Sequence, residues 1–190
     1  FKPSKGLLSE GKMSERGNPL VQGILATCEV ENGNGRYYSE DLWKREIDKY
    51  MELVRDNRAT GELDHPESQV INLKNVSHNI KDMYWDGDNV MGKIEILPTP
   101  SGNILKALID SGITVGVSSR GMGSLEESGG VMEVQDDFEL LCWDFVSTPS
   151  NPGSYMQTIR EGKENNTNPY TKANSIVTEI LCANGNCPIF

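Results

Sequence analysis

The chain has 190 residues, of which 36% are apolar, and a formal net charge of −10. The acidic balance argues against sequence-independent binding to nucleic acid, and no apolar run approaches the length of a membrane span. The start of the chain also has no apolar segment typical of a signal peptide. The length and composition predict one globular domain with a core of its own.

Hydrophobic periodicity and turn signals predict the elements in chain order. Residues 1–19 are polar and predict a flexible N-terminal arm. Strands are expected at 20–30, 73–84, 90–97, 113–115, 131–134 and 138–146. A helix begins after Ser39, a typical N-cap, and runs to about Arg55. A shorter helix covers 104–109, and Pro98 to Ser101 is expected to break the chain before it.

The domain is expected to span 20–160, followed by a linker and tail at 161–190 whose composition is rich in Asn, Lys and Glu. Cys28 and Cys142 lie in apolar runs and are predicted to be reduced core residues. Cys182 and Cys187 near the C-terminus can pair or bind metal, but no Cys/His pair with zinc spacing completes a site. We therefore expect no metal and no cofactor.

The stretch from Gly116 to Ser124 reads Gly-Val-Ser-Ser-Arg-Gly-Met-Gly-Ser and follows a β-branched run. A hydroxyl at a strand end, beside an arginine and flexible backbone N–H groups, suits a nucleophile next to an anion-stabilising pocket. Taken alone, the same letters also fit a polar strand end that runs into a loop.

His65 stands in Gly-Glu-Leu-Asp-His-Pro, between a carboxylate and a proline that restricts the local backbone. Histidine is the usual general base because its ordinary pKa lies near neutrality. The alternative is a solvated loop histidine. The other histidine, His78, lies inside a predicted strand, where we favour a packing or hydrogen-bonding role over that of a base.

Asp144 interrupts the apolar run Leu-Leu-Cys-Trp-Asp-Phe-Val. A carboxylate there is costly unless it is paired or faces solvent. Strand alternation places it on the same face as Cys142 and opposite Trp143 and Phe145. A solvent-facing aspartate on an amphipathic strand remains the alternative.

These three motifs, in this order, resemble the prohead (procapsid maturation) proteases of T-even-type tailed bacteriophages, which are related to herpesvirus assemblin, a serine protease. The resemblance runs from about Leu20 to Tyr155. It implies an α+β fold, a small β-barrel or sandwich of mostly antiparallel strands with a few surrounding helices.

The resemblance implies that Ser118 is the nucleophile and His65 the general base, with Asp144 where assemblin has its third triad member. Ser119 is the alternative nucleophile, and Asp64 the second choice for the acid that orients the imidazole. Candidates for the oxyanion or substrate contacts are Ser119, Arg120, and the loop that contains Thr148 and Asn151. For Arg120 a surface salt bridge remains an equal alternative.

Proteases of this family cut after Glu when Leu or Ile stands two residues earlier. Leu8-Ser9-Glu10 and Ile159-Arg160-Glu161 fit and flank the domain, which predicts self-processing at Glu10 and Glu161; Leu125-Glu126-Glu127 also fits. A pocket for Glu needs a cation, for which the candidates are Arg36, Lys74, Lys93 and Arg120.

The resemblance further implies that the substrates are scaffold, core and capsid proteins, and that the enzyme is a homo-oligomer, either a dimer or a ring. The expected location is the immature prohead in the host cytoplasm, with no nucleic acid or membrane partner. The alternative is a non-catalytic phage head or tail protein on the same fold. A different hydrolase is disfavoured because Arg120 replaces the second glycine of a Gly-x-Ser-x-Gly elbow.

Overall fold

The computed structural model describes residues 11–159 of the chain. The predictions for Glu10, Glu161, the tail at 161–190 and the two C-terminal cysteines therefore lie outside the described residues.

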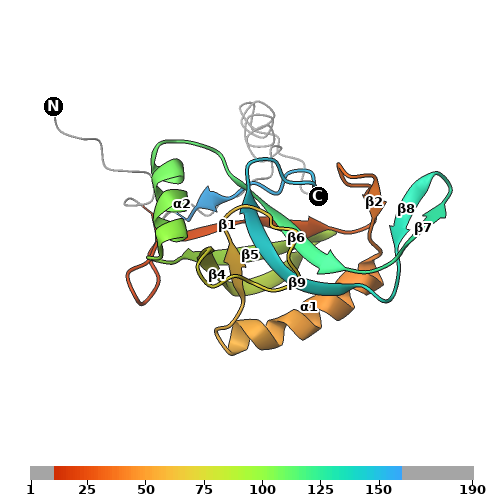
Figure 1. Ribbon diagram of the computed structural model, residues 1–190, viewed down its shortest axis with the longest axis horizontal. Coiled ribbons are helices and arrows are strands. Elements are labelled where there is room, and N and C mark those ends of the chain that lie inside the picture. Colours follow the sequence, from red (N-terminus) through yellow and green to blue (C-terminus); the bar gives the residue numbers. More distant parts are fainter. Residues whose placement is uncertain (1–10, 160–190) are drawn as a thin grey trace, which may run out of the picture. The chain divides into compact units, whose positions relative to one another are not determined.

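Strands dominate the described residues and form three sheets, with orders β10-β1-β5-β4-β3, β2-β8-β7 and β6-β9 (Figure 1). Pairs of named strands are antiparallel except β2 with β8. The strands are β1 (Leu20–Thr27), β2 (Arg36–Tyr37), β3 (Thr60–Glu62), β4 (Val76–Asp86), β5 (Asn89–Ile96), β6 (Gly116–Met122), β7 (Leu125–Ser128), β8 (Val131–Val134), β9 (Glu139–Val146) and β10 (Gln157–Thr158). The expected mixture of mostly antiparallel strands with helices is confirmed. The barrel form is wrong, because no sheet in residues 11–159 closes on itself.

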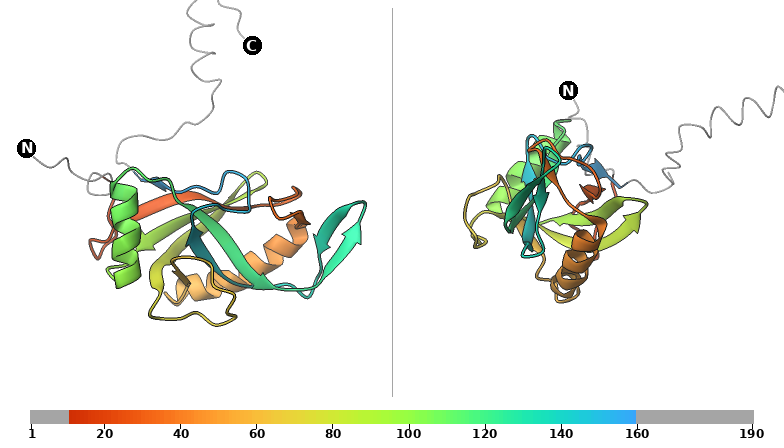
Figure 2. Two further views of the ribbon diagram at one scale, coloured as in Figure 1. Left: turned by 45° about the horizontal axis from the view of Figure 1, so that its top comes forward. Right: turned by 90° about the vertical axis from the view of Figure 1, so that its right-hand side faces the viewer.

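Two helices accompany these sheets, α1 (Glu40–Arg55) and α2 (Pro100–Asp110). Helix α1 begins as predicted, with the Ser39 hydroxyl accepting the N–H of Leu42. Helix α2 starts earlier than expected, because Thr99 caps it and Pro100 needs no N–H partner in the first turn. Helix α2 and the β7–β8 hairpin lie at opposite ends of this part of the chain (Figures 1 and 2). Neither helix in 11–159 is long and apolar enough to cross a bilayer.

Strand β6 differs from the prediction in a way that matters for the candidate nucleophile. The expected strand at 113–115 is wrong, since Ile113 instead closes the end of α2 by donating its N–H to the Leu108 carbonyl. The strand starts at Gly116, so Ser118 lies within it rather than at its end. Strand β7 was missed because all its residues are exposed and no apolar face marks it.

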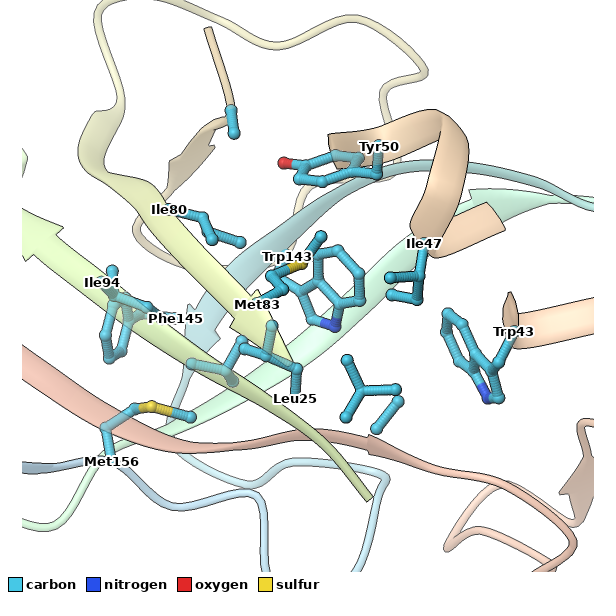
Figure 3. Packing of buried hydrophobic residues seen from close by; sticks show 14 of the residues in the cluster. Leu25, Trp43, Ile47, Tyr50, Ile80, Met83, Ile94, Trp143, Phe145 and Met156 are labelled. Carbon is cyan, nitrogen blue, oxygen red and sulfur yellow. The ribbon is translucent and has the colours of Figure 1, made fainter. Parts of the chain in front are cut away.

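The core is built around Trp143 of β9, which is fully buried (Figure 3). Its ring stacks on Trp43 of α1 at a centroid distance of 6.1 Å and meets the edge of Tyr50 at 5.0 Å. Such aromatic pairs add to the gain from burial alone. Cys28 and Cys142 are buried and free, as predicted. The aromatic face of β9 thus attaches that strand firmly to α1.

Part of the predicted N-terminal arm is attached to the sheet. The buried carboxylate of Glu95 accepts hydrogen bonds from Ser14 at 2.6 Å and Asn18 at 2.9 Å. The N–H of Lys12 donates to the carbonyl of Ile159. The two ends of the described region, at Lys12 and Ile159, therefore lie side by side.

Gly61 lies where β3 closely approaches β9, and a substitution at this position tests how tight that approach is. A β-carbon at this position would lie 2.0 Å from the Trp143 carbonyl oxygen and 2.5 Å from the His78 ring. We expect Gly61→Ala to lower the free energy of unfolding by about 2 to 3 kcal/mol, a typical cost of overpacking, as measured by urea denaturation. Gly87→Ala is the comparison, because its β-carbon meets nothing within 4 Å and only its positive φ of 58° is unfavourable, at a cost of about 1 kcal/mol. Equal losses in the two variants would contradict the packing argument.

Candidate active site

The pairing of β6 with β9 brings the predicted serine and aspartate together. Ser118 is directly opposite Asp144 in the register, and Ser119 is opposite Trp143. Directly paired residues of an antiparallel ladder project from the same face. Ser118 and Asp144 therefore share one face of this two-stranded sheet, while the Ser119 side chain projects from the face of Trp143.

The loop after β3 carries His65 to that same face. Leu63 forms a parallel bridge with Phe145, and the N–H of Asp64 donates to the Phe145 carbonyl at 2.9 Å. The Nδ1 of His65 lies 3.0 Å from the Oδ2 of Asp144, with 40% of the histidine side chain exposed. Asp64 has a φ of 71° and accepts the backbone N–H of His65. Asp64 thus shapes the turn, and Asp144 is the carboxylate that meets the imidazole.

Asp144 is completely buried, which excludes the solvent-facing alternative. Its Oδ1 accepts the N–H of Glu62 at 2.9 Å, and its Oδ2 lies 2.9 Å from the Nε of Arg120. Burial raises the pKa of Asp144, but the contacts with His65, the Glu62 N–H and Arg120 outweigh it and hold this pKa below its ordinary value. Asp144 is therefore an ionised carboxylate at neutral pH.

Arg120 has a different role from either predicted one. Its side chain is only 6% exposed and lies 2.9 Å from the Oε1 of Glu62 as well as beside Asp144. Burial disfavours its charge, but the contact with Glu62 and the nearby negative charges outweigh this and raise the pKa of Arg120. The surface salt bridge is therefore excluded: the guanidinium is buried between two protein carboxylates, and Arg120 also lines a cavity beside His65.

A cavity of about 290 Å³ opens in front of the imidazole. Ser118 and His65 both line it, and the Ser118 hydroxyl lies 3.2 Å from that of Ser150. Thr148 and Ser150 form one wall, and the turn at Asn32–Arg36 forms another; the N–H of Gly33 donates to the Ser150 carbonyl at 2.7 Å. Two loops far apart in the sequence thus complete the walls around the serine.

A second cavity of about 360 Å³ adjoins the first. The residues that line both are Arg36, Tyr38, His65 and Ser119. The second cavity continues toward the β7–β8 hairpin, where Leu125 and Val134 lie. The two cavities therefore meet at His65, which lines both of them.

Asn151, expected as a substrate contact, lines neither cavity. Its Oδ1 accepts the backbone N–H of Thr27 at 2.9 Å, and its Nδ2 donates to the Ser154 hydroxyl at 2.6 Å. The amide therefore fastens the 148–153 loop to β1. Asn151 thus stabilises the loop that carries Thr148 and Ser150 of the cavity wall.

His78 packs as predicted. Its Nδ1 lies 2.8 Å from the Ser77 hydroxyl and its Nε2 lies 3.0 Å from the Trp143 carbonyl. Burial lowers the pKa of His78 to about 4, against the opposing effect of Asp144. His78 is therefore neutral at physiological pH and remote from solvent.

Glu62 was missed as a member of the site, and Ser150 was expected there only as part of the loop that contains Thr148 and Asn151. Glu62 belongs to the Gly-Glu-Leu-Asp-His-Pro motif, but nothing in its local pattern shows that it contacts an arginine 58 positions later. Ser150 lies in a Pro- and Ser-rich loop of a kind that usually marks a simple turn. Long-range pairing, rather than local sequence, gives both residues their place.

Comparisons with known proteins identify relatives that are proteases. A family described as prohead core protein serine protease matches residues 6–166. The chain is 34% identical over 152 residues to the prohead core protein protease of Enterobacteria phage T4, which covers 77% of this chain and 71% of that protein. The solved structure of the bacteriophage T4 capsid assembly protease matches with a TM-score of 0.69 and 28% identity, over 77% of this chain and 90% of that one.

The family match includes all three motifs and the whole of the described region. Both relatives are proteases, which disfavours a purely structural role for a chain that keeps the serine, histidine and aspartate together. The expectation drawn from the motifs, a phage prohead maturation protease, is confirmed: the chain belongs to the prohead core protein serine protease family.

Proposed function

We propose that the enzyme is a serine endopeptidase with Ser118 as nucleophile, His65 as general base and Asp144 as the acid that orients the imidazole. The observation that carries this proposal is the 3.0 Å contact between His65 and Asp144, on the strand face that Ser118 shares through its register. The order of the three residues follows the assemblin pattern, with a carboxylate in the third place.

In this mechanism the Ser118 oxygen attacks the carbonyl carbon of the substrate, and its proton passes to the Nε2 of His65. Asp144 holds the opposite ring nitrogen and stabilises the imidazolium. The imidazolium then donates that proton to the leaving amine, which leaves an ester on Ser118. A water molecule, deprotonated by His65, hydrolyses the ester and releases the acid product.

The backbone N–H of Ser119 is the oxyanion donor we favour. The N–H of Val117 points away from β9, toward the Ser154 carbonyl at 2.8 Å. Backbone groups alternate in direction along a strand, so the N–H of Ser119 points to the same edge as that of Val117. This edge borders the 148–153 loop, and the donor follows the nucleophile directly, which is a preorganised arrangement.

Scaffold, core and capsid proteins in the immature prohead are the proposed substrates, cut after Glu with Leu or Ile two residues earlier. Arg36 is the cation best placed to receive the Glu side chain. It is exposed and lines both cavities, and within residues 11–159 no carboxylate forms an ion pair with it. Lys93 instead lies near Asp82 at 3.6 Å, and Lys74 lines neither cavity. Assembly as a dimer or ring in the host cytoplasm belongs to the same proposal.

Substitution of the triad tests the mechanism directly. We expect Ser118→Ala and Asp144→Asn to reduce kcat/KM by on the order of 10⁴-fold, the usual loss for a triad member, in an assay with a fluorogenic peptide that contains Leu-Ser-Glu. Ser119→Ala keeps the backbone N–H and should lose less than about tenfold. A Ser118→Ala enzyme with native activity would place the nucleophile elsewhere.

Arg36→Ala tests the recognition of glutamate. Loss of a charge-assisted hydrogen bond should lower kcat/KM for the Glu peptide by roughly 10- to 100-fold. The same peptide with Gln in place of Glu should be cut equally by the native and variant enzymes. Lys93→Ala, outside both cavities, is the matched control; a similar loss in this variant would argue for a general electrostatic effect.

Self-processing at Glu10 and Glu161 can be followed by intact mass after long incubation at neutral pH. Fragments that end at these two residues should form from the native chain and be absent from Ser118→Ala. The third matching site, Glu127, should stay intact because it is paired within the β7–β8 hairpin, and a protease needs an unpaired segment. Cleavage at Glu127 alone would contradict the proposed sites.

A further inference from the structure

Glu62 is a buried carboxylate that the proposed triad does not use. It lies at the end of β3 and is completely inaccessible to solvent. Its Oε1 accepts the backbone N–H of Asn72 at 3.0 Å and lies 2.9 Å from the Nη2 of Arg120. Its Oε2 is buried with no hydrogen-bond partner among residues 11–159. Since apolar side chains often stabilise a core as well as a buried ion pair does, fold stability alone gives little reason for this arrangement.

The charged groups form a row that ends at the cavity. The Nη2 of Arg120 lies 2.9 Å from Glu62 and 3.2 Å from the Oδ1 of Asp144, and its Nε lies 2.9 Å from the Oδ2 of Asp144. Asp144 in turn contacts His65 at 3.0 Å. The four residues therefore contact one another in the order Glu62, Arg120, Asp144, His65. The first is fully buried and the last is 40% exposed.

We propose that Glu62 is a positioning residue that balances the charge of Arg120, so that Asp144 acts on His65 with its full negative charge. This inference rests on the proposed triad. With Arg120 as its only charged neighbour, Asp144 would be neutralised, and the imidazolium that forms when His65 accepts the Ser118 proton would lose its stabilisation. Glu62 cancels the guanidinium charge, and the whole row becomes neutral when the imidazole is protonated.

Other titratable groups near His65 do not alter this balance. The groups that face the row from neighbouring elements are Cys142 on β9, His78 on β4, Tyr50 on α1, Arg36 on β2 and Asp64 in the loop. Burial raises the pKa of Tyr50, which is therefore neutral at assay pH. Burial raises the pKa of Cys142 to about 12 and lowers the pKa of His78 to about 4, so both are neutral at assay pH. Arg36 and Asp64 are exposed, and their charges are largely screened by solvent.

The test uses charge changes of opposite sign in full-length chains that also carry Ser118→Ala, which prevents self-cleavage. The chain has only two histidines, so the titration midpoint of the His65 ring is resolved by NMR. Glu62→Gln should lower this midpoint by about one pH unit, because it leaves Arg120 unbalanced. Arg120→Met should raise it, and the double variant should return it close to its starting value.

Glu46→Gln is the matched control. Glu46 is also a buried carboxylate that lies 2.9 Å from an arginine, Arg45, and accepts a backbone N–H, that of Leu140. It belongs to α1 and lines neither cavity. This substitution should leave the His65 midpoint unchanged, which separates charge balance from the general effect of losing a buried carboxylate.

In chains with native Ser118, Glu62→Gln should shift the acidic limb of the kcat/KM profile down by the same amount and lower its plateau by about tenfold. An unshifted midpoint in Glu62→Gln, or no return in the double variant, overturns the inference. If Arg120→Met does not fold, the His65 midpoints of Glu62→Gln and Glu46→Gln are sufficient: the inference requires a lower midpoint in the first and an unchanged one in the second. Activity that survives Ser118→Ala overturns the proposed triad instead. The His65 titration then still tests whether Glu62 offsets the charge of Arg120.

Discussion

The buried negative charge of Asp144 is the main constraint on this structure. An ionised carboxylate without water is stable only when charged groups and N–H donors surround it. Here β6 supplies Arg120, β3 supplies the N–H of Glu62, and the following loop supplies His65. Two segments far apart in the sequence, β6 and β3 with its following loop, are thus held against β9 by the need to compensate one charge.

The two faces of β9 explain how the core and the site depend on one another. Trp143 packs against the aromatic rings of α1 and Phe145 against the His78 ring, while Asp144 projects from the opposite face, which it shares with Ser118. A slip of one residue in the register would place Asp144 among the aromatic rings and Trp143 against the charged groups of Arg120 and Glu62. Core packing thus positions the acid, and the same constraint decides which of the two neighbouring serines meets it.

Local signals in the sequence were sufficient for some elements and insufficient for others. Helix α1 was predictable from its cap and its apolar periodicity, and the β4–β5 hairpin from its turn. The strands β2, β3 and β10 are only two or three residues long and have no periodicity to detect. The barrel prediction failed because closure depends on pairing between distant strands, which no local pattern specifies.

The sequence by itself determined the family and the candidate nucleophile, base and acid, because three short motifs in a particular order carry that information in residue types alone. Only the tertiary structure decided that Ser118 rather than Ser119 shares the face of Asp144, that Arg120 is buried between two carboxylates, and that Asn151 serves the loop. The physical reason is that register and charge compensation are properties of pairs. Arg120 and Glu62 acquire their roles only when folding removes water from both of them at once.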